Sequence, residues 1–136
     1  MGMAKEVTMA EMEKLTINLT PVDVGQIELL VEHGFYSNRA EFIRVAIRDL
    51  LAKHAETVRE TTTRQGLTIG AALYTRRILE ERRGAGEGLQ IRVVGMLSIA
   101  EDVEPELARE TIESVMVRGI FKASKEVKEA LADRTC

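Results

Sequence analysis

Six residues near the N-terminus constrain the fold of this chain more than any other stretch. From Lys14 to Leu19, polar and apolar side chains alternate. This is the period-2 pattern of a β-strand with one buried face and one solvated face. A strand this short is not stable alone, and the residues that follow predict helices rather than a second strand. The strand therefore needs a partner from elsewhere.

Two helices are predicted behind this strand. Thr20 is expected to cap the first helix, with Pro21 at its first position, and Gly34 to end it. The second helix is expected to begin at Asn38, with Glu41 three residues later in a capping-box-like entry. One apolar stripe then follows at helical spacing: Phe42, Ile43, Ala46, Ile47, Leu50 and Leu51. The predicted order is strand, helix, tight turn, helix.

These residues carry a resemblance to a known family. The segment Lys14-Leu-Thr-Ile-Asn-Leu-Thr-Pro21, followed by Gly34-Phe-Tyr-Ser-Asn-Arg-Ala-Glu-Phe-Ile-Arg44, resembles the ribbon-helix-helix family of CopG-like regulators. In that family two chains pair their strands into an antiparallel ribbon, which lies in the major groove of DNA. The resemblance covers residues 14–54 only.

The resemblance implies a role for each matching residue. Lys14, Thr16 and Asn18 would face the bases, and Asn38 and Arg39 would hold a backbone phosphate. The phosphate role also has a physical reason, because the free N–H groups and the dipole at a helix start favour an anion. The implied dimer core consists of Leu15, Ile17, Leu19, Phe42, Ile43 and Ile47.

Charge gives this interpretation little support. The formal net charge is −3, and residues 1–54 hold six Lys and Arg against eight Asp and Glu. A DNA-binding domain usually has a basic surface, so we expect modest non-specific affinity. The only basic region, residues 64–92, holds six Arg against three Glu. It is either a solvated helix face or a supplementary phosphate contact.

The predicted fold class is α+β, with four segments. Residues 1–13 form a flexible arm, and residues 14–54 form the ribbon-helix-helix domain. Residues 55–88 form a connector with a basic helix, and the Thr-rich residues 55–65 are expected to fray. A short strand around Leu67–Ala71 is an open alternative within this connector. Residues 89–136 form a small β-α-β-α module, with strands at 89–99 and 114–122 and helices at 105–112 and 125–133. Gly84–Gly88 follow a helix and precede a strand, so they indicate a turn rather than a phosphate-binding loop.

Catalysis and metal binding find no support in the residue types. His33, His54 and Cys136 are the only soft ligands, and no two of them have metal-site spacing. We expect no enzyme activity, no cofactor and no metal. No apolar run is long enough to cross a membrane, and no secretion signal precedes the strand. The single Cys forms no disulfide within the chain, which predicts a cytoplasmic protein.

The sequence therefore predicts a homodimeric, sequence-specific DNA-binding transcriptional regulator, with the role of a repressor. Its partners would be double-stranded DNA, a second copy of itself, and an effector or protein at residues 89–136. Two alternatives stay open. One is an antitoxin-like autoregulator that binds a toxin through its C-terminal part. The other is an assembly module whose ribbon only dimerises the chain.

Overall fold

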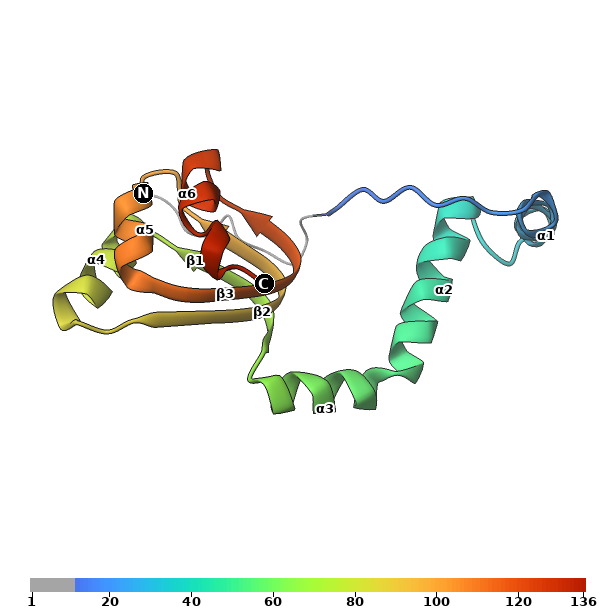
Figure 1. Cartoon of the computed structure of the whole chain (residues 1–136). Coiled ribbons are helices and arrows are strands. Elements are labelled where there is room, and N and C mark those ends of the chain that lie inside the picture. Colours follow the sequence, from blue (N-terminus) through green and yellow to red (C-terminus); the bar gives the residue numbers. More distant parts are fainter. Residues whose placement is uncertain (1–11) are drawn as a thin grey trace. The chain divides into compact units, whose positions relative to one another are not determined.

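The computed structural model describes residues 12–136, so residues 1–11 of the predicted arm lie outside the described residues. The described chain divides into two units (Figure 1). We name residues 14–61 the helical unit and residues 62–136 the sheet module.

The helical unit consists of an extended N-terminal segment and helices. Helix α1 spans Pro21–Glu32, α2 spans Arg39–Lys53, and α3, Ala55–Gln65, begins in this unit. Both predicted caps are confirmed. The Thr20 hydroxyl accepts a hydrogen bond from the Asp23 N–H at 3.2 Å, and the Asn38 amide oxygen accepts one from the Glu41 N–H at 2.8 Å.

Helix α3 corrects one prediction. Residues 55–65 do not fray but form a complete helix, despite their Thr content. An ion pair between Glu56 and Arg59 joins side chains three residues apart, and Thr62 is buried with 7% of its surface exposed. Helix propensities of polar residues differ by only about 0.7 kcal/mol, so contacts of this kind outweigh the unfavourable composition.

The sheet module contains one more strand and one more helix than the predicted β-α-β-α unit. Three parallel strands lie in the order β1-β2-β3: Thr68–Tyr74, Leu89–Ile99 and Ile112–Lys122. Each strand is followed by a helix: α4 (Arg76–Ala85), α5 (Pro105–Thr111) and α6 (Lys125–Ala130). A short turn of 3-10 helix, η2, follows at Ala132–Arg134.

The module thus begins within the predicted connector. Strand β1 pairs with β2 along its whole length, from Thr68 opposite Val93 to Tyr74 opposite Ile99. Its signal in the sequence is weak because Gly70, Ala71 and Ala72 have low β-propensity. The predicted turn at the glycine run is confirmed, since Gly86 ends α4 in the left-handed conformation and β2 starts at Leu89.

The core of the module lies between one face of the sheet and the helices. Alternate residues of β2, such as Ile91, Val93 and Leu97, are buried, as period 2 requires. They share one cluster with Leu79 of α4, Leu107 of α5, and Val127 and Leu131 around α6. Parallel strands need such helical crossovers, and the helices supply the second layer of the core.

A row of glycines crosses the sheet. Gly70, Gly95 and Gly119 lie opposite one another in the register of the three strands. Their φ angles are +143°, +138° and +134°, in a region that only glycine occupies readily. A Cβ atom on Gly95 would lie 2.0 Å from the Gly70 carbonyl oxygen, and one on Gly119 would lie 2.0 Å from that of Gly95. The inner positions of this row therefore require glycine.

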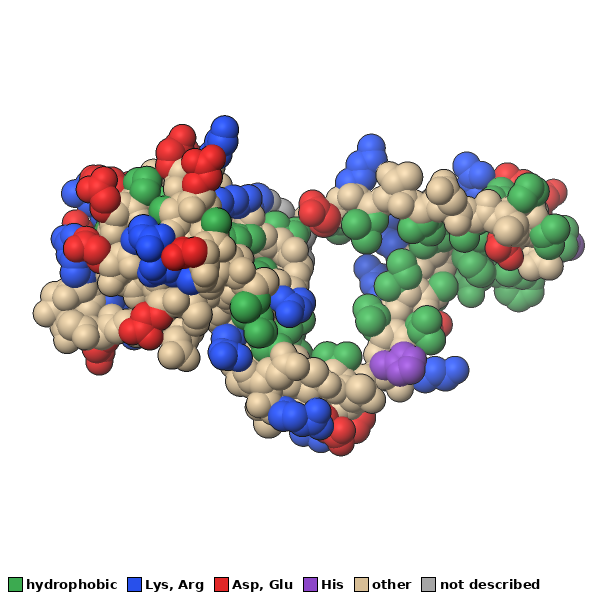
Figure 2. Space-filling view, viewed as in Figure 1, with side chains coloured by type: hydrophobic (Ala, Val, Ile, Leu, Met, Phe, Trp, Pro, Cys, Tyr) green, Lys and Arg blue, Asp and Glu red, His purple; other side chains and the backbone are tan. Residues whose placement is uncertain are grey.

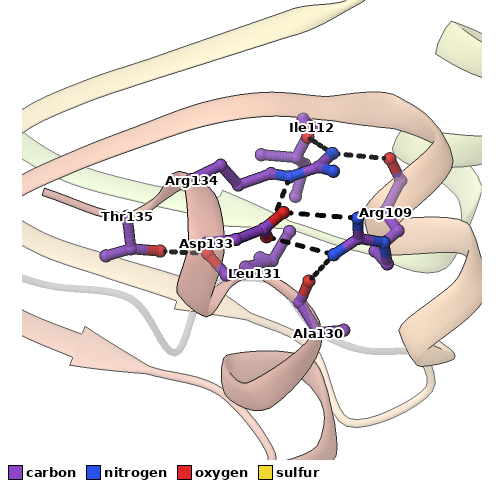
Figure 3. A network of polar contacts seen from close by, with 7 residues as sticks. All are labelled: Arg109, Ile112, Ala130, Leu131, Asp133, Arg134 and Thr135. Carbon is purple, nitrogen blue, oxygen red and sulfur yellow. Dashed lines mark hydrogen bonds and ion pairs between the residues drawn. The ribbon is translucent and has the colours of Figure 1, made fainter.

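Arginine side chains fix the C-terminal end of the module (Figure 3). Arg109 on α5 donates to the Ala130 carbonyl at 2.6 Å and to the Asp133 carboxylate at 3.0 Å. Arg134 donates to the carbonyl oxygens of Arg109 and Ile112. The Arg109 guanidinium lowers the pKa of Asp133 below its ordinary value. These contacts hold Thr135 beside β3, where it forms a parallel bridge with Val115.

Candidate nucleic-acid interface

The segment before α1 carries the predicted base-reading side chains. Residues 12–20 are neither helical nor paired as a strand within one chain, and all are exposed. Lys14, Thr16 and Asn18 therefore lie on the surface, as do the apolar residues between them. Leu15, Ile17 and Leu19 expose 80%, 57% and 43% of their surface. Burial of that apolar area is favourable by about 25 cal/mol per Å², so this segment lacks a cover.

The helices that follow this segment also leave apolar side chains exposed. Ile27 is the only buried hydrophobic residue of the described helical unit. Among the predicted dimer-core residues of α2, Phe42 and Ile43 are half-buried, whereas Ile47 is exposed. Figure 2 shows hydrophobic side chains on the surface of this unit. One copy of the unit therefore forms no closed core among its described residues.

The start of α2 is an ordered polar site. Its cap, Asn38, leaves the N–H groups of Arg39 and Ala40 without a helical carbonyl to bond. The Glu41 carboxylate accepts from the Ser37 N–H at 2.7 Å and from the Ser37 hydroxyl at 2.8 Å. The expected capping box is thus shifted by one residue, because Glu41 bonds Ser37 rather than the Asn38 N–H. These bonds lower the pKa of Glu41, chiefly through the backbone of Ser37.

Two contacts shape the start of α2 that the sequence analysis did not predict. The Tyr36 ring packs edge-on against the Phe42 ring, with centroids 5.0 Å apart, and thereby fixes the turn on α2. The Arg39 guanidinium lies 3.6 Å from the Glu28 carboxylate of α1. The contact of Tyr36 with Phe42 could have been predicted, because two aromatic residues six positions apart flank the start of a helix. The Arg39–Glu28 pair joins two helices, so local sequence carries no signal for it.

The basic helix is largely compensated by acids. On α4, Arg76 pairs with Glu80 at 3.1 Å and Arg77 with Glu81 at 3.3 Å. Arg83 lies 3.0 Å from Glu110 of α5, and Arg92 donates to the Gln65 carbonyl at 2.9 Å. Glu80 raises the pKa of Arg76 above its ordinary value. These pairs favour the interpretation of α4 as a solvated helix face.

The described part of the chain contains neither a cluster of metal ligands nor a helix that could span a membrane. Among residues 12–136, no three His, Cys, Asp or Glu side chains come together as a metal site. None of the helices described there is long and apolar enough to span a membrane.

Comparison with known proteins extends the resemblance beyond the helical unit. A model of the ribbon-helix-helix transcriptional regulator family matches residues 10–128, which includes most of the sheet module. The chain is also 33% identical over 45 residues to the transcriptional regulator CdrS of Halobacterium salinarum, a match that covers 33% of this chain and 82% of that protein. No solved structure matches.

The family match covers residues of both units, whereas the resemblance seen in the sequence covered residues 14–54 only. Its range begins before the exposed segment at residues 12–20 and ends within α6, so it covers both the predicted ribbon and the three-stranded sheet. The chain belongs to the ribbon-helix-helix transcriptional regulators, and it is a DNA-binding transcription regulator.

Proposed function

We propose that two copies of this chain pair residues 14–19 into an antiparallel ribbon that lies in the DNA major groove. The observation that carries the proposal is the exposure of Leu15, Ile17 and Leu19, which alternate with Lys14, Thr16 and Asn18. Pairing would bury the apolar side chains against α2 of both copies and leave the polar side chains outward. A ribbon of two strands fits the major groove.

Each polar residue then has a defined role. Thr16 and Asn18 offer a hydroxyl and an amide, which can bond to base edges, and Lys14 can reach a guanine edge or a phosphate. Asn38 and Arg39 would hold a phosphate at the start of α2, where two N–H groups lack helical partners. The helical unit holds little net charge from Lys14 to His54, with five Lys and Arg against five Asp and Glu. Specific contacts, rather than bulk charge, would therefore supply most of the affinity for the preferred site.

The regulator would act as a repressor in the cytoplasm, by occupying its binding site, without catalysis or a cofactor. The antitoxin-like alternative is less well supported, because tails that bind toxins generally order only on binding. Residues 89–131 instead belong to a module with its own buried core. Titration of Thr16→Ala and Asn18→Ala on DNA distinguishes base reading from the alternative in which the ribbon only dimerises the chain.

The experiment compares Thr16→Ala and Asn18→Ala with Thr57→Ala, an exposed threonine on α3. Specific DNA fragments are first selected from a genomic library, and each variant is titrated on selected and scrambled duplexes at two salt concentrations. Loss of a base contact should cost about 1–3 kcal/mol on the selected site and little on scrambled DNA. Arg39→Ala should weaken binding to both duplexes and reduce the salt slope by about one.

A second variant tests the dimer. Ile17→Lys places a charge in the predicted ribbon interface, so it should give unfolded or non-native helical units. Wild-type protein that sediments as a folded monomer would contradict the ribbon. If the wild type selects no fragment, and Thr16→Ala and Asn18→Ala bind like Thr57→Ala, the ribbon does not read bases.

A further inference from the structure

Within the described residues, the outer edge of β1 is open, and the outer edge of β3 is open over most of its length. Strand β1 pairs with β2 on one side, and no described strand of this chain lies on its other side. The outer edge of β3 is occupied only near its start, where Thr135 forms a bridge with Val115 and the Cys136 N–H donates to the Val115 carbonyl. From Val117 onward that edge is open within the described chain. Unpaired edges of this kind are templates for another strand.

The sheet repeats one interface. The β1–β2 and β2–β3 pairs are both parallel, and each strand leads into a helix on the same side of the sheet. The repeat extends to atomic detail, because Gly95 faces the Gly70 carbonyl and Gly119 faces the Gly95 carbonyl, each with the same close approach. A third interface of this kind would join β3 to a β1.

The two edges are complementary in direction. The Cβ position of Gly70 meets no atom of the described residues within 4 Å, although its φ of +143° matches those of the other two glycines. Gly70 therefore has the conformation that admits a neighbouring carbonyl, at an edge where residues 12–136 supply none. By the same repetition, the Gly119 carbonyl points off the open edge of β3.

In this register, β1 of one copy can pair with β3 of the next without meeting Thr135 or Cys136. With Gly70 opposite Gly119, the residues of β1 from Thr68 to Tyr74 lie opposite Val117 to Ala123. That stretch starts just beyond Val115, the residue that Thr135 and Cys136 already contact. Apolar side chains at the β1 end are left uncovered, since Ile69 exposes 57% of its surface and Ile78 of α4 exposes 38%.

We propose that the sheet module binds a second copy of this chain head to tail, with β1 of one copy in parallel with β3 of the next and Gly70 facing Gly119. Such an interface is heterologous, so it closes into a ring or continues as an open chain according to the rotation between copies. It is separate from the proposed DNA-reading ribbon, and it would link chains through a different surface.

Disulfide cross-linking tests the register directly. In full-length protein with Cys136→Ser, Ile69→Cys and Arg118→Cys are placed on separate chains and co-expressed. Across the proposed junction their Cα atoms would be about 4.8 Å apart, which is within disulfide range. Within one chain the same two positions are two strand spacings apart, about 9.6 Å, which is too far.

Mild oxidation should link the two variants to each other and leave either variant alone unlinked. The control, Ile69→Cys with Lys122→Cys, is shifted by four residues, about 13 Å along the strand, and should give at least tenfold less product. Both substitutions in one chain should give either a ladder of covalent multimers or a single closed ring.

Three results would overturn the proposal. The first is equal linking of Ile69→Cys to itself, which would indicate β1 paired with β1 across a two-fold axis. The second is equal yield from the shifted control. The third is no linking by either Ile69→Cys with Arg118→Cys or a second pair in the same register, Ala71→Cys with Ile120→Cys, once circular dichroism shows that the variants fold. Because no DNA is present, these results do not depend on the DNA-binding proposal.

Discussion

Arg39, the proposed phosphate ligand, already has a carboxylate beside it. Its guanidinium lies 3.6 Å from the Glu28 carboxylate, and both side chains are largely exposed. An exposed pair of this kind stabilises the fold by at most about 1 kcal/mol. Its larger effect would be on binding, because Glu28 repels a phosphate and competes for the same guanidinium.

Neutralising that carboxylate should strengthen DNA binding. We expect Glu28→Gln to tighten binding to selected and scrambled duplexes by a similar factor, about two- to fivefold at low salt, with a smaller gain at high salt. Glu32→Gln, an exposed carboxylate at the end of the same helix, is the matched control and should have a weaker effect. Equal gains for the two variants in the titration would indicate general charge rather than the Arg39 site.

At the scale of the strands, the glycine row allows a comparison in which backbone strain is matched. Gly70→Ala and Gly95→Ala put a Cβ on residues with φ of +143° and +138°, but only the second meets the carbonyl oxygen of the neighbouring strand, at 2.0 Å. At protein concentrations low enough to dissociate the proposed β1–β3 junction between copies, Gly95→Ala should therefore destabilise the sheet module by about 1–3 kcal/mol more than Gly70→Ala. Urea unfolding followed by circular dichroism measures the difference, and equal destabilisation would contradict the steric argument.

The elements predicted correctly from the sequence are those with local signals. Thr20 and Asn38 cap helices through residues only three positions away, and Leu89–Ile99 alternates clearly enough to be recognised as a strand. Strand β1 lacked such a signal, since its small residues gain their structure from pairing with β2. The contact of Arg109 with Asp133 likewise joins residues far apart in sequence.

Prediction of the proposed DNA-contacting site from the sequence was limited for a different reason. The resemblance named Lys14, Thr16 and Asn18, and the structure shows them exposed on an unpaired segment. Their function depends on a second chain, which neither the periodicity of one sequence nor the contacts within one chain describes. Their roles as base contacts therefore stay predictions.

For the whole molecule, the two units should be separable in function. The buried cluster of the sheet module draws only on residues from Leu79 to Leu131, whereas the proposed ribbon uses residues 14–19. A fragment ending at Thr61 should still dimerise, because Leu15, Ile17 and Leu19 remain. It should lose cooperativity on DNA with several sites, because head-to-tail pairing is gone.

Sedimentation and binding isotherms on such DNA measure both properties. A fragment that binds with the cooperativity of the full chain would show that the sheet module does not link neighbouring dimers on DNA. A fragment that sediments as a folded monomer would instead contradict the ribbon.

The parallel sheet also determines how the chain acquires its structure. Each strand must close a long loop through a helix before it can pair, as Thr68 does with Val93, and such non-local pairing is slow. It nevertheless takes place within one chain, so its rate is independent of concentration. The helical unit has local contacts but no closed core of its own, so its folding would require an encounter between two chains. Refolding should therefore show two phases of different kinetic order, and dilution should slow only the phase that belongs to residues 14–61.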